Sequence, residues 1–161
     1  FLLTLTLFND YSFGPGNYWG TILYNKKNGH LSDTDFVDMQ KAYNSYQDKS
    51  YLHDVEGTYY PPFKFHDICV TEKQLKLLNR VKVSRKFAHR HHITGDYVIY
   101  CSPGTLQEKI DITEIVKHCE KNIYNHKWKP NDILIWDNIR MMHRRHSFEG
   151  SRILWRSQFW I

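Results

Sequence analysis

The stretch that most constrains the fold runs from Trp128 to Arg156 and contains two short strand-like runs on either side of His143. The first run, Ile133 to Trp136, is apolar, favours β structure and follows the turn residues Pro130-Asn131-Asp132. The second run, Arg152 to Arg156, follows another turn. Since His143 lies between the two runs, the segment predicts a strand, a turn that carries a histidine, and a second strand.

These residue types suggest a chemistry. Residues at even spacing share one face of a strand, so Arg152 and Arg156 point to one side, and Ile153 and Trp155 point to the other. Neutral imidazole binds iron, zinc or copper, and guanidinium binds carboxylate through two parallel hydrogen bonds. A metal ligand beside a carboxylate clamp is what an Fe(II) enzyme with an anionic co-substrate requires. The alternative is an exposed histidine with two solvated arginines on an edge strand.

The sequence W-K-P-N-D-I-L-I-W-D-N-x-R-x-x-H, followed by R-I-L-W-R, resembles the C-terminal signature of the taurine-dioxygenase-like (TauD/TfdA) family. These are Fe(II)/2-oxoglutarate dioxygenases. The resemblance implies a mainly β fold with flanking helices, the double-stranded β-helix (jelly roll) of clavaminate-synthase-like proteins. It implies that His143 is the distal iron histidine. Arg152 then binds the far carboxylate of 2-oxoglutarate, and Arg156 lies by the co-substrate and the substrate anion.

A second segment, Asp33 to Tyr46, is predicted to begin a helix. Asp35 or Asp38 could cap this helix, with Ala42 and Tyr43 on its inner face.

The D-T-x-F-x-D core of the same segment also resembles a family motif, although Leu31-Ser32 replace the glycine pair that precedes it in the family. Thr34 matches the threonine whose hydroxyl binds 2-oxoglutarate. A hydroxyl beside an arginine would complete the recognition of a carboxylate oxygen. The alternative is that Thr34 is simply a threonine at a helix entrance.

The family holds its iron with H-x-D/E and the distal histidine. Asp10 precedes Thr34 at close to the family's spacing and begins a sequence that resembles D-x-S/T-F/Y, so it is predicted to be the carboxylate ligand. The first histidine is then expected at position 8, where the chain has Phe8. A phenyl ring has no lone pair to donate to a metal.

Three explanations for Phe8 remain open. The low-complexity leader Phe1 to Phe8 could be non-native and have displaced the real H-x-D, and this explanation is favoured because the other site residues are intact. The protein could instead be a pseudoenzyme that keeps only the 2-oxoglutarate pocket. Finally, another histidine such as His30 could replace the missing ligand.

Three histidines lie between His89 and His92, in a segment that resembles the family's H-P-x-T-G, with His91 at the histidine position. A zinc site is not favoured, because no Cys or His pair has finger spacing. His91 is therefore predicted to be a structural turn residue.

Periodicity predicts three further elements: strands over Tyr18–Tyr24 and Tyr97–Tyr100, and a helix over Ile110–Tyr124.

Charge and cysteine content bound the possible partners. The net charge is +5, but no Lys/Arg run reaches five or six residues, so a nucleic-acid-binding module rests on net charge alone and no nucleic-acid partner is expected. No apolar stretch approaches the roughly 18–20 residues of a membrane span, and no membrane partner is expected. Cys69, Cys101 and Cys119 form no C-x-x-C pair, which favours a reducing compartment and a cytoplasmic location.

The resemblance extends from about Phe8 to Arg156 and predicts that residues 1–161 form a single, partial and N-terminally incomplete TauD/TfdA-like domain. The implied reaction uses Fe(II) and O₂, releases succinate and CO₂ from 2-oxoglutarate, and hydroxylates a small anionic substrate. The alternative is a catalytically impaired protein that binds 2-oxoglutarate only, because of Phe8. Core surface left bare by a missing segment predicts low solubility or a homo-oligomer.

Overall fold

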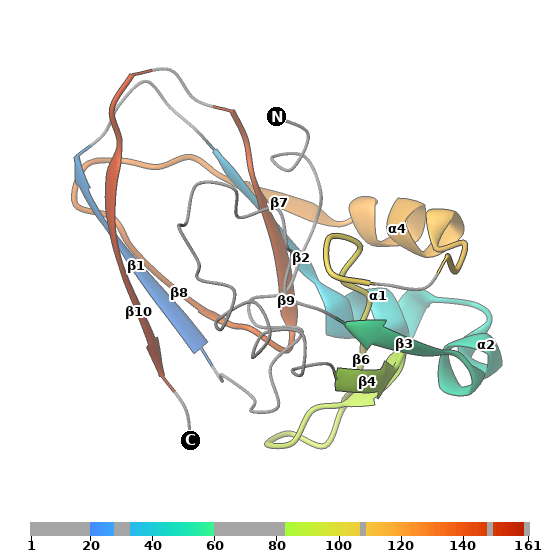
Figure 1. The fold of residues 1–161 in the computed structure, drawn as a ribbon. Coiled ribbons are helices and arrows are strands. Elements are labelled where there is room, and N and C mark those ends of the chain that lie inside the picture. The colour runs from blue at the N-terminus through green and yellow to red at the C-terminus, as the bar shows by residue number, and fades with distance from the viewer. Residues whose placement is uncertain (1–19, 28–32, 60–82, 107–108, 148–149, 160–161) are drawn as a thin grey trace, which may run out of the picture.

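Two three-stranded antiparallel sheets, with strand orders β10-β1-β8 and β7-β2-β9, stand opposite each other (Figure 1). The computed structural model describes residues 20–27, 33–59, 83–106, 109–147 and 150–159. The strands of the two sheets are β1 (Gly20–Lys27), β8 (Ile133–Asp137) and β10 (Ile153–Phe159), and β2 (Thr34–Asp38), β7 (Ile123–His126) and β9 (Met141–Arg145).

The helices and two small two-stranded sheets gather beside the β7-β2-β9 sheet, on the side away from β1 and β10 (Figure 1). They are α1 (Met39–Ser45), α2 (Lys49–Asp54) and α4 (Thr113–Glu120), together with β3 (Glu56–Tyr59), β4 (Val83–Lys86), β5 (Ala88–Arg90) and β6 (Tyr97–Ile99). This is the predicted mainly β architecture with flanking helices.

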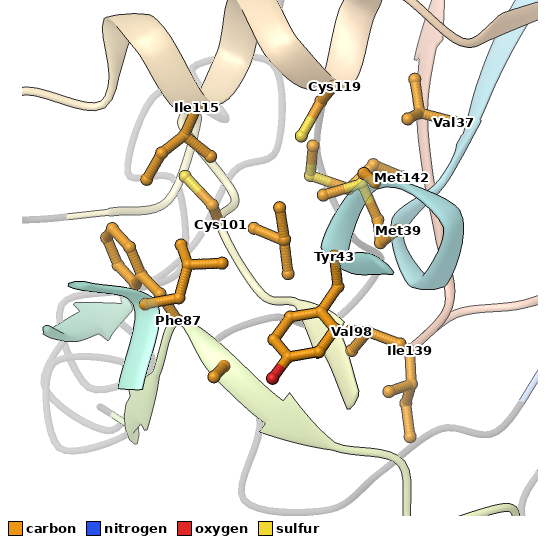
Figure 2. Close-up of a cluster of buried hydrophobic side chains, with 14 residues drawn as sticks. Val37, Met39, Tyr43, Phe87, Val98, Cys101, Ile115, Cys119, Ile139 and Met142 are labelled. Atoms are coloured by element: carbon orange, nitrogen blue, oxygen red, sulfur yellow. The ribbon is translucent and has the colours of Figure 1, made fainter. Parts of the chain in front are cut away.

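The main hydrophobic core fills the space between the β7-β2-β9 sheet and these helices (Figure 2). Val37 and Met142 are fully buried and enter the core from β2 and β9, and Ile115 and Cys119 enter it from α4. Because side chains alternate along a strand, the residues next to Val37 in β2 face the other sheet. The core therefore holds one face of the sheet and leaves the opposite face to the interior of the β-sandwich.

The other sheet has an inner and an outer face that differ in burial. Thr21 pairs with Trp136, and both are buried on the inner face. The outer face carries large exposed apolar side chains: Ile133, Ile135, Ile153 and Trp155, which are 65%, 60%, 43% and 56% exposed. An apolar patch of this kind is what the predicted homo-oligomer would use, and that oligomer stays a prediction.

The prediction of a helix from Asp33 onward is wrong for its first part, because Thr34–Asp38 forms strand β2. The strand is hard to predict from the sequence because Asp35, which is only 3% exposed, puts a charged residue at a position that alternation would make apolar. Of the two predicted caps, Asp38 is the one that caps α1, accepting hydrogen bonds from the N–H groups of Gln40 and Lys41. Ala42 and Tyr43 are buried, as predicted.

Two other predicted boundaries also differ. The predicted helix over Ile110–Tyr124 is shorter, since α4 ends at Glu120 and Ile123 begins strand β7. The strand-turn-strand prediction for the C-terminal stretch omitted β9, which contains His143. β9 has no simple apolar alternation, because its sequence Met-Met-His-Arg-Arg is apolar at its start and basic at its end.

Several predicted features lie outside the described residues: the leader Phe1–Phe8, Asp10, His30 and Cys69. Among the described cysteines, Cys101 and Cys119 are both buried free thiols, as expected for a chain without a disulfide framework. Within the described ranges, no helix has the length and apolar character needed to cross a membrane.

Candidate functional site

The pairing of β2 with β9 brings two of the predicted site residues together. Phe36 pairs with His143 and Thr34 pairs with Arg145, so these four residues share the face that looks toward the other sheet. Thr34, Phe36 and His143 are 5%, 3% and 8% exposed. The sheet register therefore places the predicted iron histidine one pleat away from the predicted 2-oxoglutarate threonine.

His143 is held between two aromatic rings. Its imidazole stacks on Phe36, with ring centroids 5.9 Å apart, and meets the edge of Trp136 at 5.1 Å. Trp136 belongs to β8 of the opposite sheet, so the imidazole bridges the interior of the sandwich. Two side-chain χ angles of a histidine packed in this way have little freedom, which is what a metal ligand of defined geometry needs.

A short turn fixes the position of His143 relative to β8. The Asp137 carboxylate, at the end of β8, accepts hydrogen bonds from the backbone N–H groups of Ile139 at 2.7 Å and Arg140 at 3.0 Å. These bonds satisfy the turn's N–H groups and set the direction in which β9 leaves.

A second cluster, the carboxylate corner, consists of Thr34, Trp128 and Arg152. The indole N–H of Trp128 donates a hydrogen bond to the Thr34 hydroxyl at 3.0 Å, and the Arg152 guanidinium lies 5.0 Å above the Trp128 ring. Burial, followed by the positive charge of Arg145, lowers the pKa of the Arg152 guanidinium below its usual value. Two guanidinium groups close together, beside a hydroxyl, form a site that favours an anion.

Arg156 lies further along β10, opposite Leu23 of β1. Its strand neighbour Trp155 pairs with Tyr24 and packs on it from the outer face, so Arg156 projects from the inner face. Arg156 is exposed, whereas Arg152 is partly buried.

The carboxylate corner and His143 are suited to different ligands, a carboxylate and a metal ion. The hydroxyl of Thr34 and the guanidinium of Arg152 are chemically suited to a carboxylate. His143 supplies an imidazole for a metal, but no three His, Cys, Asp or Glu side chains within the described ranges gather closely enough to hold one. An iron site at His143 therefore needs a ligand from outside those ranges, and Asp10 is the predicted one.

The prediction that His91 is a structural turn residue is confirmed. His91 is 3% exposed; its Nδ1 accepts hydrogen bonds from the N–H groups of Ile93 and Thr94, and its Nε2 lies 2.7 Å from Asp137. Because Nδ1 accepts, Nε2 carries the proton and donates the hydrogen bond that the Asp137 carboxylate accepts.

Sequence reasoning missed three residues of these clusters: Trp128, Trp136 and Arg145. Both tryptophans belong to the C-terminal signature, but there they served only to recognise the family. The alternation that places Arg145 on the face of His143 could have indicated Arg145 if β9 had been recognised as a strand.

The family described as "Taurine catabolism dioxygenase TauD, TfdA family" matches residues 9–158. The chain belongs to the TauD/TfdA family. The alpha-ketoglutarate-dependent 2,4-dichlorophenoxyacetate dioxygenase of Burkholderia sp. (strain RASC) is 27% identical to this TauD/TfdA chain over 137 residues, which cover 73% of the chain and 44% of that relative.

Solved structures match the fold over nearly the whole chain. A protein from Burkholderia xenovorans assigned as an alpha-ketoglutarate dependent 2,4-D dioxygenase has a TM-score of 0.82 at 19% identity, covering 98% of this chain and 68% of its own. AAD-2, solved with Mn(II) and N-oxalylglycine, has a TM-score of 0.80 at 21% identity, covering 98% and 69%. A taurine dioxygenase from Burkholderia xenovorans has a TM-score of 0.75 at 16% identity, covering 99% and 58%.

These matches confirm the predicted jelly-roll fold class of this TauD/TfdA chain. The chain spans less than half the length of the curated relative that it matches.

Proposed function

We propose that this TauD/TfdA chain carries the iron-binding and 2-oxoglutarate-binding parts of a dioxygenase that hydroxylates a small anionic molecule. The observation that carries the proposal is the juxtaposition of His143 with the carboxylate corner on one inner face. We further propose that residues 1–161 form one partial domain of this enzyme. A cytoplasmic location stays a prediction.

Each residue has a separate role in this proposal. Thr34 and Arg152 bind the far carboxylate of 2-oxoglutarate, which leaves the 2-oxo acid end directed toward His143. His143 and Asp10 hold Fe(II), and bound iron supplies the activation of O₂ that the oxidation of a C–H bond requires. Phe36 and Trp136 keep the His143 imidazole in one orientation and make that side of the site apolar. The complex of AAD-2 with N-oxalylglycine, an isostere of 2-oxoglutarate, supports this ligand class.

The substrate is proposed to be an anion. The relatives are named for 2,4-dichlorophenoxyacetate and taurine, which are both small molecules with an anionic group, a carboxylate and a sulfonate respectively. Arg156 projects from the inner face of β10, near enough to solvent to meet an incoming molecule, and would attract such a charge.

The second candidate is a protein that binds 2-oxoglutarate without turnover. Phe8 favours it, because this residue stands where the family's first iron histidine is expected. Both candidate functions use the carboxylate corner to bind 2-oxoglutarate. They differ only in whether the chain also binds iron.

Anaerobic titration with Fe(II) and 2-oxoglutarate tests both, with the metal-to-ligand charge-transfer absorption as the readout. A band at near-stoichiometric iron in the chain as given, followed by succinate formation in air, is expected for the dioxygenase. A band that appears only in Phe8→His identifies the non-catalytic candidate. Arg152→Met should weaken 2-oxoglutarate in either case, and Trp155→Phe on the outer face is the control. No 2-oxoglutarate binding by the chain or by Phe8→His would refute both candidates.

A further inference from the structure

One buried side chain contacts both residues of the proposed carboxylate clamp. Trp128 is 2% exposed, donates its indole N–H to the Thr34 hydroxyl, and lies under the Arg152 guanidinium. Thr34, Trp128 and Arg152 come from three places that are far apart in the sequence. The indole is therefore the physical link between the two groups that would bind one carboxylate.

Trp128 is itself firmly positioned. The turn that follows it is closed by hydrogen bonds from the Lys129 N–H to the Asp132 carboxylate at 2.7 Å and from the Asp132 N–H to the Lys129 carbonyl at 3.2 Å. Asn25 of β1 anchors the same turn, since its side-chain amide donates to the Lys129 carbonyl at 2.7 Å. Asn131 takes a left-handed φ of 69°, which asparagine tolerates better than most residues.

The chemistry of the two partners fixes the direction of the Trp128–Thr34 bond. An indole N–H can only donate, so the Thr34 oxygen must accept from it. The hydroxyl carries a single proton, and this proton points away from the indole N–H that the oxygen accepts. The Thr34 hydroxyl is thereby set as a donor toward the interior, where an acceptor such as a carboxylate oxygen would lie.

The geometry points to Trp128 as a positioning residue that makes the corner selective for a co-substrate with a second carboxylate. We propose that it does so by orienting the Thr34 proton and by supporting the plane of the Arg152 guanidinium. This inference rests on the proposed function, since it concerns the same 2-oxoglutarate site. Trp128 acts through Thr34 and Arg152 and need not touch the co-substrate.

Calorimetric titration of the chain and of its Phe8→His form tests the inference, with Mn(II) as the metal so that no turnover occurs. The two probes are 2-oxoglutarate and 2-oxopentanoate, which has the same chain length without the far carboxylate. Trp128→Phe keeps an aromatic ring but removes the N–H donor together with part of the ring volume. It should weaken 2-oxoglutarate about three- to tenfold, the range expected for one hydrogen bond, and leave 2-oxopentanoate within about twofold.

A double-mutant cycle shows whether Trp128 acts through Thr34. Thr34→Val should lose the same selectivity, and Trp128→Phe should add little in the Thr34→Val background. Trp155→Phe, the same indole-to-phenyl change on the outer face, should alter neither affinity. Equal weakening of both probes, or full additivity in the cycle, would overturn the positioning role.

A measurement that leaves Trp128 unchanged covers the case in which Trp128→Phe folds poorly. In the ¹⁵N-labelled chain, Thr34→Val should shift one indole N–H resonance, and 2-oxoglutarate should shift the same resonance in the unmutated chain. Failure of 2-oxoglutarate to move that resonance while it binds would overturn the inference alone. Absence of any 2-oxoglutarate binding would instead refute the proposed function.

Discussion

His91 donates a hydrogen bond from Nε2 to the Asp137 carboxylate 2.7 Å away, and this bond joins the turn between β5 and β6 to the end of β8. The other oxygen of Asp137 accepts from the N–H groups that begin the turn into β9. His91, which lies outside the two main sheets, thus helps to fix the position of β9, the strand that carries His143.

Replacement of His91 by alanine should lower the free energy of unfolding by about 2–3 kcal/mol, because it leaves a partly buried carboxylate short of a donor. His92, which is exposed and stacks on His91, provides the matched control, and His92→Ala should change stability by less than about 0.5 kcal/mol. Urea denaturation of both variants measures the difference. Equal losses of stability in the two variants would mean that the hydrogen bond from His91 to Asp137 does not stabilise the fold.

Asp38 caps α1 and also accepts two hydrogen bonds from Arg140, at 3.1 Å and 2.6 Å. Burial alone would raise the pKa of this carboxyl, but the Arg140 bonds and the helix N–H groups outweigh burial and hold the pKa below 3.8. The stabilisation is therefore complete above about pH 4 and is lost as the pH falls through the lowered folded-state value.

Asp38→Ala should cost about 2 kcal/mol at pH 7, whereas Asp38→Asn, which keeps the cap acceptor, should cost about half as much. Asp48, the cap of α2, bonds to Ser50 and to the N–H of Tyr51, so Asp48→Ala should cost less. Chemical denaturation at pH 7 and pH 3 should show the Asp38 variants converging on the unmutated chain in acid. A constant difference at both pH values would contradict the role of the charge.

His89 should make stability depend on pH in a higher range. Burial, followed by the charge of Arg85 and then by electrostatic coupling to the neighbouring His91 and His92, lowers the pKa of His89 from 6.5 to about 4. Between these values the unfolded chain binds a proton that the folded chain does not, so stability falls as the pH drops from about 6.5 to 4.

Thermal melts of His89→Gln between pH 4 and 7 should be flatter than those of the unmutated chain. The difference should amount to roughly 1–2 kcal/mol over the range, after allowance for the partial exposure of His89. Parallel curves for His89→Gln and the unmutated chain would show that another group governs this range.

Gly57 and Gly104, whose φ angles are not positive, provide a matched test of packing. A Cβ on Gly57 would lie 2.6 Å from Leu106 Cδ1 and 2.9 Å from Phe87 Cε1, whereas a Cβ on Gly104 would have no heavy atom within 4 Å. Gly57→Ala should therefore cost about 1–3 kcal/mol, and Gly104→Ala should be neutral or slightly stabilising. Similar melting temperatures for the two variants would show that Leu106 and Phe87 relax freely.

Arg145 should contribute to co-substrate affinity through its charge, provided that the proposed function holds. Arg145→Gln should weaken 2-oxoglutarate about two- to fivefold in low salt, and the difference should shrink in high salt because the charge is exposed. Arg90→Gln removes an exposed charge that bonds to the Gly95 carbonyl of the β5–β6 turn and should leave affinity unchanged. Calorimetry at two ionic strengths measures both, and a salt-independent loss in Arg145→Gln would contradict an electrostatic role.

Local signals sufficed for features set by neighbouring residues. The apolar run Ile133–Trp136 predicted strand β8, and helical spacing predicted the burial of Ala42 and Tyr43. Asp38 was one of two predicted caps of α1. The C-terminal signature was enough to predict the family and the jelly roll. The elements depend on residues close together in the sequence, and the family depends on a signature that lies within Trp128–Arg156.

The missed features depend on contacts that no window of sequence contains. Asp35 is buried in β2 because Arg144 and Asn125 each donate to it at 2.8 Å from neighbouring strands. Trp128 reaches Thr34 across 94 positions of the chain. Periodicity cannot show a charge neutralised, or a hydroxyl oriented, by a partner so distant in sequence.

The pairing register of β2 and β9 decides which side chain of β9 meets the interior. Because successive residues of β9 face opposite sides, a slip of β9 by one residue against β2 would put Met142 or Arg144 in the place of His143 on the inner face. Such a slip would exchange an imidazole for a thioether or a guanidinium. The chemistry of the inner face therefore tolerates no error in this register, not even of a single residue.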